Sequence, residues 1–291
     1  MKPVAVAVLG RGVVDPDSPV IAADDSALAR GQAAFETLRV YGGRAFGIDE
    51  HLARLRASAA RMELPDVARE DLEALAHQAL AASGLQDAAL RFYWTGGRDG
   101  ARTATALATV TPIPDDLETL RARGIRVVSL DLGIDHAARA RSPWLLGGVK
   151  STSYAVHVAA LAEARRRGAD DAVLLASDGM VLEGATSNVW WVAGERIRTP
   201  GLELGILAGV TRSHLLRLGR DLGYTMEEGA WPLDDVLAAT EVFLSSSVRE
   251  VIGAVAVDGR TVGDGHPGPV AMALQAALRS EATLGGRSSG A

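Results

Sequence analysis

The chain contains no cysteine among its 291 residues, and aromatic residues make up only 4% of it. Without cysteine, disulfides, thiolate metal ligands and cysteine nucleophiles are excluded. A strong excess of one charge is also lacking, because 36 acidic residues against 30 basic ones give a net charge of −6. That balance gives no electrostatic reason to expect a nucleic acid or an anionic membrane as a partner.

Long hydrophobic runs are missing as well. The first apolar run, residues 4–9, is too short for a signal-peptide core or a membrane span, so we expect a cytoplasmic protein without a membrane segment. The six histidines show no metal-binding spacing such as H-E-x-x-H, and we predict no metal site. No G-x-S-x-G element marks a serine nucleophile.

The remaining composition, with 48% hydrophobic and 23% charged residues, is typical of a globular protein. Strand-like and helix-like periodicities intermix along the chain, which predicts an α/β (or α+β) fold. Pro112 and Pro114, followed by two aspartates, favour a break in regular structure. We therefore predict an N-terminal domain of residues 1–113, a linker at 114–122 and a C-terminal domain of residues 123–291, whose Gly/Ser-rich tail at 285–291 is frayed.

Lys150 is the candidate nucleophile. It follows a stretch with two glycines and precedes a predicted helix at 154–167, so it is partly shielded from water. Such shielding favours the neutral amine, which acts as nucleophile and base. The alternative is an ordinary surface lysine beside a helix. A P-loop is excluded, because Val149 and Trp144 occupy positions that require glycine.

Glu183 is the candidate partner for a nitrogen heterocycle. It ends a predicted strand that follows a hairpin signal at Asp178 and Gly179. A carboxylate there is able to bind a pyridine nitrogen and keep it protonated, which makes the ring an electron sink. The alternative is a solvated glutamate at the end of a strand.

Three other segments offer groups that bind phosphate. The helix predicted from residue 211 has free N–H groups at its start and adds the Thr211 hydroxyl, which together form either a phosphate site or an ordinary helix end. Ser246 and Ser247 follow a predicted strand at 241–244 and are either further donors or a plain serine turn. Arg54 lies off the apolar stripe of its predicted helix, where it binds a phosphate or simply faces solvent.

Taken in this order, the segments resemble the class IV aminotransferases, the fold type IV pyridoxal-phosphate enzymes. That family includes branched-chain and D-amino acid aminotransferases, (R)-amine transaminases and aminodeoxychorismate lyase. The resemblance rests on Phe-Glu-Thr-Leu-Arg at 35–39, the helix at 50–55, Lys150 with Tyr154, and residues 183–188, 209–212 and 245–247.

The resemblance implies a homodimer in which pyridoxal 5'-phosphate lies between a smaller N-terminal and a larger C-terminal domain. Lys150 is expected to bind the cofactor as a Schiff base and to shuttle protons, and Glu183 to pair with the pyridine nitrogen. The remaining expected cofactor contacts are Arg54, Tyr154, Val210, Thr211, Ser246 and Ser247. Weaker candidates for substrate binding are Phe35, Arg91, Arg98 and Arg102. Many members have Gly-Asp-Gly before the Phe-Glu strand, but residues 31–34 are Gly-Gln-Ala-Ala here, so the resemblance specifies the cofactor better than the substrate.

Three functions agree with these residues to different degrees. The preferred one is transamination between an amino acid or primary amine and a 2-oxo acid. The alternative is the lyase reaction that releases pyruvate and 4-aminobenzoate from aminodeoxychorismate with the same cofactor. A non-catalytic protein that keeps the fold is disfavoured, because Lys150, Glu183 and the phosphate donors are all intact.

Overall fold

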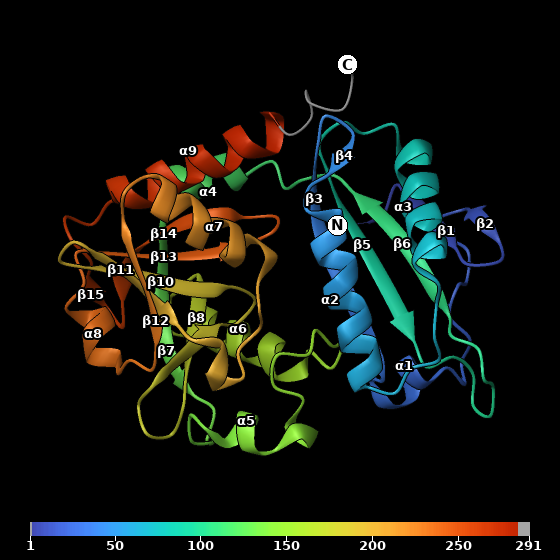
Figure 1. Cartoon of the computed structure of the whole chain (residues 1–291), viewed down its shortest axis with the longest axis horizontal. Coiled ribbons are helices and arrows are strands. Elements are labelled where there is room, and N and C mark those ends of the chain that lie inside the picture. The colour runs from blue at the N-terminus through green and yellow to red at the C-terminus, as the bar shows by residue number, and fades with distance from the viewer. Residues whose placement is uncertain (1, 285–291) are drawn as a thin grey trace. The chain divides into compact units, whose positions relative to one another are not determined.

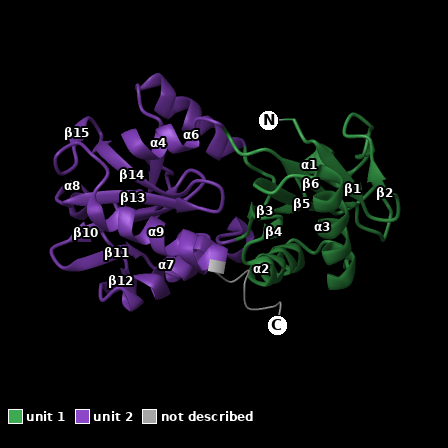
Figure 2. Cartoon of the chain, turned by 90° about the horizontal axis from the view of Figure 1, so that it is seen from above, with its two compact units in different colours: residues 1–114, 149–154, 285–291 green, residues 115–148, 155–284 purple. Residues whose placement is uncertain are grey.

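A computed structural model describes residues 2–284 of the chain. These residues divide into two compact units, which Figure 2 colours separately. The first unit contains residues 2–114 and Val149–Tyr154, and the second contains Asp115–Gly148 and Ala155–Leu284. The tail predicted to be frayed, residues 285–291, lies outside the described residues.

The first unit is an antiparallel sheet covered by helices (Figure 1). Its strand order is β2-β1-β6-β5-β3-β4, and every neighbouring pair is antiparallel. The strands are β1 (Ala5–Val8), β2 (Gly12–Val14), β3 (Ala33–Tyr41), β4 (Arg44–Ala45), β5 (Ala88–Thr95) and β6 (Ala106–Thr111). The helices are α1 (Ser26–Arg30), α2 (Ile48–Arg61) and α3 (Arg69–Ser83).

The core of this unit forms where α2 and α3 pack on the sheet. Apolar residues of α2 recur at helical spacing, so Leu52, Leu55 and Ala59 are all buried. They join Leu38 and Val40, which recur at strand spacing on β3. The packing fixes β3 and α2 relative to each other, and both elements carry candidate site residues.

The second unit contains a nine-stranded mixed sheet. The order is β12-β11-β10-β13-β14-β7-β8-β9, with β15 paired to β14, and the pairs β11–β12, β14–β7 and β7–β8 are parallel. The strands are β7 (Ile125–Asp131), β8 (Asp171–Leu175), β9 (Val181–Gly184), β10 (Asn188–Ala193), β11 (Arg196–Pro200), β12 (Thr225–Gly229), β13 (Glu241–Ser246), β14 (Glu250–Val257) and β15 (Arg260–Thr261).

Helices cover the second sheet. They are α4 (Leu117–Arg123), α5 (Ala138–Arg141), α6 (Ala155–Arg166), α7 (Val210–Asp221), α8 (Leu233–Leu237) and α9 (Pro269–Leu284), with 3₁₀ turns η1 (Pro143–Leu145) and η2 (Leu202–Leu204). Both α4 and α9 contact β14, and α7 contacts β13. Mixed strands and helices in both units confirm the predicted α/β fold class.

Two segments differ from the predicted division of the chain. The predicted linker, residues 114–122, contains most of α4, because Leu117 and Leu120, spaced three residues apart, bury one face of a short helix. Val149–Tyr154 packs with the first unit, since residue 151 forms a bridge with residue 34 at the start of β3. Neither the packing of α4 nor the bridge between residues 151 and 34 is visible in local sequence patterns. Within residues 2–284 no helix has the length and apolar character needed to cross a membrane.

Candidate functional site

Lys150 lies beside the start of β3 in the first unit. Its backbone is held on both sides, because its N–H donates to the Ser58 hydroxyl (3.2 Å) and its carbonyl accepts from the Phe35 N–H (3.0 Å). The amine Nζ lies 4.3 Å from the centre of the Phe35 ring and 5.9 Å from that of Tyr154. The two rings meet edge to face at 5.2 Å. Two predicted site residues, Phe35 and Tyr154, are therefore gathered around the amine of a third, Lys150.

The lysine content of the chain singles out this amine. Lys150 and Lys2 are the only lysines in the sequence, so 28 of the 30 basic residues are arginine (30 − 2). Lys2 is 67% exposed and pairs with Asp17. An arginine side chain carries a cation as well as lysine does, but it stays protonated and is not a nucleophile. Lys150 is therefore the shielded lysine of this chain, and it offers a primary amine that an arginine at the same position would not. The scarcity of lysine is visible in the sequence, but it is a property of the whole chain and not of a local motif.

Arg54 lies in a buried ionic cluster on the same unit. Its guanidinium binds Glu36 of β3 in bidentate fashion, with Nε to Oε1 at 2.7 Å and Nη2 to Oε2 at 2.8 Å. His51, one turn earlier on α2, has its Nδ1 2.7 Å from the same Oε2. Glu36 and His51 are 0% and 1% exposed. The cluster fixes the guanidinium of Arg54 and leaves its Nη1 outside the bidentate pair. Sequence reasoning did not identify Glu36 or His51 as parts of the site.

The electrostatics of this cluster favour an ionised Glu36 and a neutral His51. Burial alone raises a carboxyl pKa, but the charge of Arg54 and the hydrogen bonds from His51 and Arg54 outweigh it and lower the pKa of Glu36 to about 2. Burial lowers the pKa of His51; the hydrogen bond and charge of Glu36 oppose this, and the positive charges of Arg54 and Lys150 add to it. Lys150 is tied to the helix that carries His51 and Arg54, because its backbone N–H donates to Ser58 of α2.

Glu183 stands at the end of β9 in the second unit and is 9% exposed. Its Oε2 accepts the backbone N–H of Leu207 at 3.1 Å, and its Oε1 accepts from Nη1 of Arg139 at 3.0 Å. Arg139, on α5, packs against two glycines, since a Cβ added at Gly147 or Gly205 would come within 2.7 or 2.6 Å of the Arg139 Cβ. Glu183 is therefore a buried, anchored carboxylate. The role of Arg139 depends on a long-range contact, and the sequence did not indicate it.

The predicted amide donors lie at the start of α7, three residues after Leu207, whose N–H binds Glu183. No side chain caps this helix, so the amides of its first turn, including those of Val210 and Thr211, lack a capping partner. The N-cap is Gly209, where an added Cβ would lie 2.1 Å from Oδ1 of Asn188. Asn188 in turn donates to the carbonyl of Leu207, the residue whose N–H binds Glu183. A helix N-terminus with open amides is an anion-binding feature.

The predicted serine donors lie at the end of β13. Ser245, the residue before them, pairs across the sheet with Asn188 and accepts a hydrogen bond from the indole of Trp190 at 2.8 Å. Ser246 and Ser247 are only partly buried. Asn188 thus connects the end of β13 to the start of α7 through Gly209. The second unit thereby places the two groups of predicted phosphate donors on neighbouring elements.

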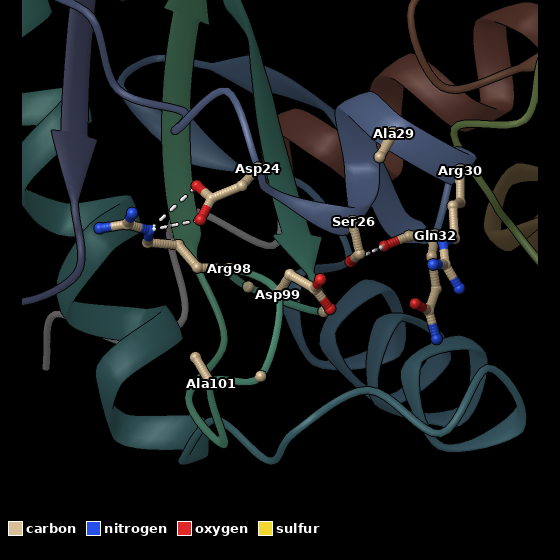
Figure 3. Close-up of a pocket in the computed structure, with 11 residues that line it drawn as sticks. Asp24, Ser26, Ala29, Arg30, Gln32, Arg98, Asp99 and Ala101 are labelled. Atoms are coloured by element: carbon tan, nitrogen blue, oxygen red, sulfur yellow. Dashed lines mark hydrogen bonds and ion pairs between the residues drawn. The ribbon is translucent and has the colours of Figure 1, made fainter.

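The three predicted substrate arginines are not gathered. Arg91 of β5 donates to the hydroxyl of Thr111, and Arg102 is exposed. Arg98 pairs with Asp24 at 3.0 Å on the rim of a cavity of about 400 Å³ (Figure 3). Gln32, which belongs to the segment that departs from the family pattern, also lines this cavity. Among residues 2–284, no group of three histidine, aspartate or glutamate side chains is arranged to hold a metal ion.

Comparisons with known proteins agree on one family. The family model described as Amino-transferase class IV matches residues 33–257. A bifunctional aminodeoxychorismate lyase / D-amino acid transaminase of Mycobacterium tuberculosis is 34% identical over 266 residues, which cover 88% of this chain and 92% of the relative. A D-alanine aminotransferase of Bacillus licheniformis is 30% identical over 265 residues, covering 88% and 90%.

Solved structures give the same result. A hypothetical aminotransferase from Mycobacterium tuberculosis, in its alpha-ketoglutarate and PMP bound form, superposes with a TM-score of 0.90 at 31% identity, covering 97% of this chain and 100% of that one. The PLP-bound form of a hypothetical aminotransferase from the same organism superposes with a TM-score of 0.89, also at 31% identity and with the same coverage. These matches confirm the family resemblance seen in the sequence.

Proposed function

The chain belongs to the class IV aminotransferase family, and we propose that it is a pyridoxal-phosphate-dependent enzyme that transfers an amino group between an amino acid or primary amine and a 2-oxo acid. The observation that carries this proposal is the Lys150 amine, held beside the Phe35 ring at 4.3 Å in a chain with one other lysine. A shielded primary amine is the group that such an enzyme needs for covalent attachment and proton transfer.

The donor set of the chain fits this cofactor. When bound, pyridoxal phosphate supplies an aldehyde that condenses with amines and a ring that accepts the electron pair of a broken C–H bond. Glu183 offers a buried, anchored carboxylate for the ring nitrogen. The buried hydroxyl of Ser187 has no hydrogen-bond partner among the described residues, so the region next to Glu183 retains a donor for a further group.

Each predicted residue has a proposed task. Lys150 would hold the cofactor through its Nζ, and once a substrate amine takes its place there, the released Nζ would accept the proton of the substrate carbon. Glu183 would accept a hydrogen bond from the protonated ring nitrogen of the cofactor. The expected phosphate contacts are Arg54, the Val210 and Thr211 amides, Ser246 and Ser247, and Tyr154 is expected near the phenolic oxygen of the cofactor.

For substrate recognition we propose roles by residue type. The Phe35 ring offers an apolar surface beside the amine. Arg91, Arg98 and Arg102 are the proposed candidates for a substrate carboxylate. Arg98 is bound to Asp24 and Arg91 to Thr111, so each has to exchange a partner to take that role.

Amino transfer is tested directly with the purified protein. We expect D- or L-amino acids, or a primary amine, to react with 2-oxoglutarate and release glutamate, with a rate that requires both substrates. Omission of 2-oxoglutarate from the assay should stop the reaction, because the amino group then has no acceptor. A protein that binds the cofactor but forms no glutamate from any donor contradicts the proposal.

The lyase reaction is the second candidate, because one relative is described as having both activities. The same proton removal by Lys150 serves a lyase, which needs no 2-oxo acid. Incubation with aminodeoxychorismate distinguishes the two: rapid release of 4-aminobenzoate and pyruvate without a 2-oxo acid favours the lyase. Release slower than amino transfer favours our assignment.

We also propose a homodimer, as the family resemblance implies. Light scattering on the eluted holoprotein is expected to give twice the chain mass of 30.3 kDa. A mass of one chain at micromolar concentration contradicts this part of the proposal.

A further inference from the structure

The turn that carries Ser246 and Ser247 has an unusual backbone. Strands β13 and β14 end in the pair Ser246–Glu250, which leaves a three-residue connection. Hairpins of this length place the residue after the turn in the left-handed region, where glycine is usual. This chain has Glu250 there, with φ of 58°. A glutamate in that conformation has to be held by its surroundings.

Glu250 is held through its carboxylate, which is 1% exposed. Its Oε2 lies 2.8 Å from Nη2 of Arg121 and accepts a hydrogen bond from Nε of Arg279 at 2.9 Å. Gln275, one turn before Arg279 on α9, contacts the same oxygen and accepts the N–H of Val251 at 2.8 Å. Two helices therefore bind the residue that closes the turn.

Arg121 also binds the turn itself. From α4 its Nε donates to the carbonyl of Arg249 at 3.1 Å, and its Nη2 donates to the carbonyl of Val248 at 3.4 Å. Its side chain is only 9% exposed. One guanidinium thus contacts two of the three turn residues and the carboxylate that follows them. The planar guanidinium suits this task, because it presents several donors in a fixed geometry.

We propose that Arg121 and Glu250 are positioning residues for the phosphate site: they hold the β13–β14 turn so that Ser246 and Ser247 present their donors to an anion. The proposal rests on the proposed function, which assigns these serines to the phosphate of the cofactor. Donors held in place before binding give tighter binding, because no ordering cost remains. Glu250 has a left-handed backbone and is bound by two arginines, and these contacts fix the conformation of the turn. A serine turn without a ligand does not require such contacts.

The test compares two ligands that differ only in the phosphate. Apoprotein is titrated with pyridoxal phosphate and with pyridoxal, and the ratio of the two affinities is measured for the wild type, Arg121→Ala and Glu250→Ala. We expect the ratio to fall about tenfold in both variants, a change of ~1.4 kcal/mol, while pyridoxal affinity stays the same. A residue that only stabilises the fold lowers both affinities together.

Further variants keep the outcome clear if an alanine variant does not fold. Arg121→Lys keeps the charge but loses the contacts to two carbonyls, so a reduced ratio is expected. Glu250→Gly adopts the left-handed backbone freely and should lose less than Glu250→Ala. The matched control is Arg198→Ala, since Arg198 also binds two carboxylates in this unit, Glu227 and Asp235, and should leave the ratio unchanged.

Two results overturn the proposal and are distinguishable. If wild-type apoprotein binds pyridoxal as tightly as pyridoxal phosphate, the phosphate site of the proposed function is itself wrong. If the wild type prefers the phosphorylated ligand and folded Arg121 and Glu250 variants keep that preference, only the positioning role is wrong.

Discussion

Replacement of Glu36 by glutamine removes the anion at the centre of the cluster that holds Arg54. Glu36 is 0% exposed and binds Arg54 and His51 through both carboxylate oxygens. The lowering of its pKa from 4.5 to about 2 corresponds to ~3 kcal/mol of stability at neutral pH, at about 1.36 kcal/mol per unit. Glu36→Gln also leaves the Arg54 charge without its counter-ion, and breaking a buried pair in this way typically costs about 3–5 kcal/mol. We expect a loss of free energy of unfolding in this range.

The pH dependence gives the sharper signature. Because the folded-state pKa of Glu36 is depressed, its contribution is complete above pH 4.5 and is lost as the pH falls from 4.5 towards 2. The difference between wild type and Glu36→Gln should be constant from pH 7 to pH 5. At pH 3.5, one unit below 4.5, it should shrink by ~1.4 kcal/mol.

Urea unfolding of the apoprotein at these pH values, followed by circular dichroism, measures the difference. The matched control is Glu70→Gln, an exposed first-turn glutamate of α3, for which a change within ~0.5 kcal/mol is expected. A Glu36→Gln variant as stable as this control, or a difference that does not shrink in acid, refutes the ion-pair account of the cluster.

Two further predictions concern the second unit. Gly209→Ala places a Cβ 2.1 Å from Oδ1 of Asn188. We therefore expect a loss of ~1–3 kcal/mol in the free energy of unfolding, measured by thermal unfolding, and weaker cofactor binding, measured by titration of the apoprotein. Unchanged binding contradicts the assigned geometry of the α7 N-terminus. Arg139→Ala removes the partner of Glu183 Oε1, and we expect about tenfold slower amino transfer at saturating cofactor. The control is Arg141→Ala, which should keep the wild-type rate because the ion pair of Arg141 with Asp135 is exposed.

Local patterns predicted the parts of the fold that depend on neighbouring residues. The alternation of residues 35–41, the glycine pair at 42–43 and the apolar stripe of residues 52, 55 and 59 are such local patterns, and the structure has β3, β4 and α2 at these positions. The family resemblance is likewise confirmed, because it rests on the order of several short segments. Helix α4 was missed, since prolines and aspartates next to it favour a linker and only its long-range packing makes it a helix.

The candidate site was predictable to a smaller extent. Residues that bring their own chemistry, such as Lys150 and Glu183, were identified from type and position. Their partners were not, because Glu36, Arg139 and Arg121 act through contacts between residues far apart in the sequence. An isolated arginine or glutamate has many solvated counterparts on any protein surface, so only the fold distinguishes it.

Lys150 is the proposed covalent attachment point of the cofactor. The most direct measurement is reduction of the holoprotein with sodium borohydride, followed by proteolysis and mass spectrometry of the peptides. With two lysines in the chain, the result is unambiguous. We predict a pyridoxyl group on Lys150 in the wild type and no such group at position 150 in the Lys150→Arg variant. A label confined to Lys2 or to the terminal amine, or no stable label at all, contradicts the claim.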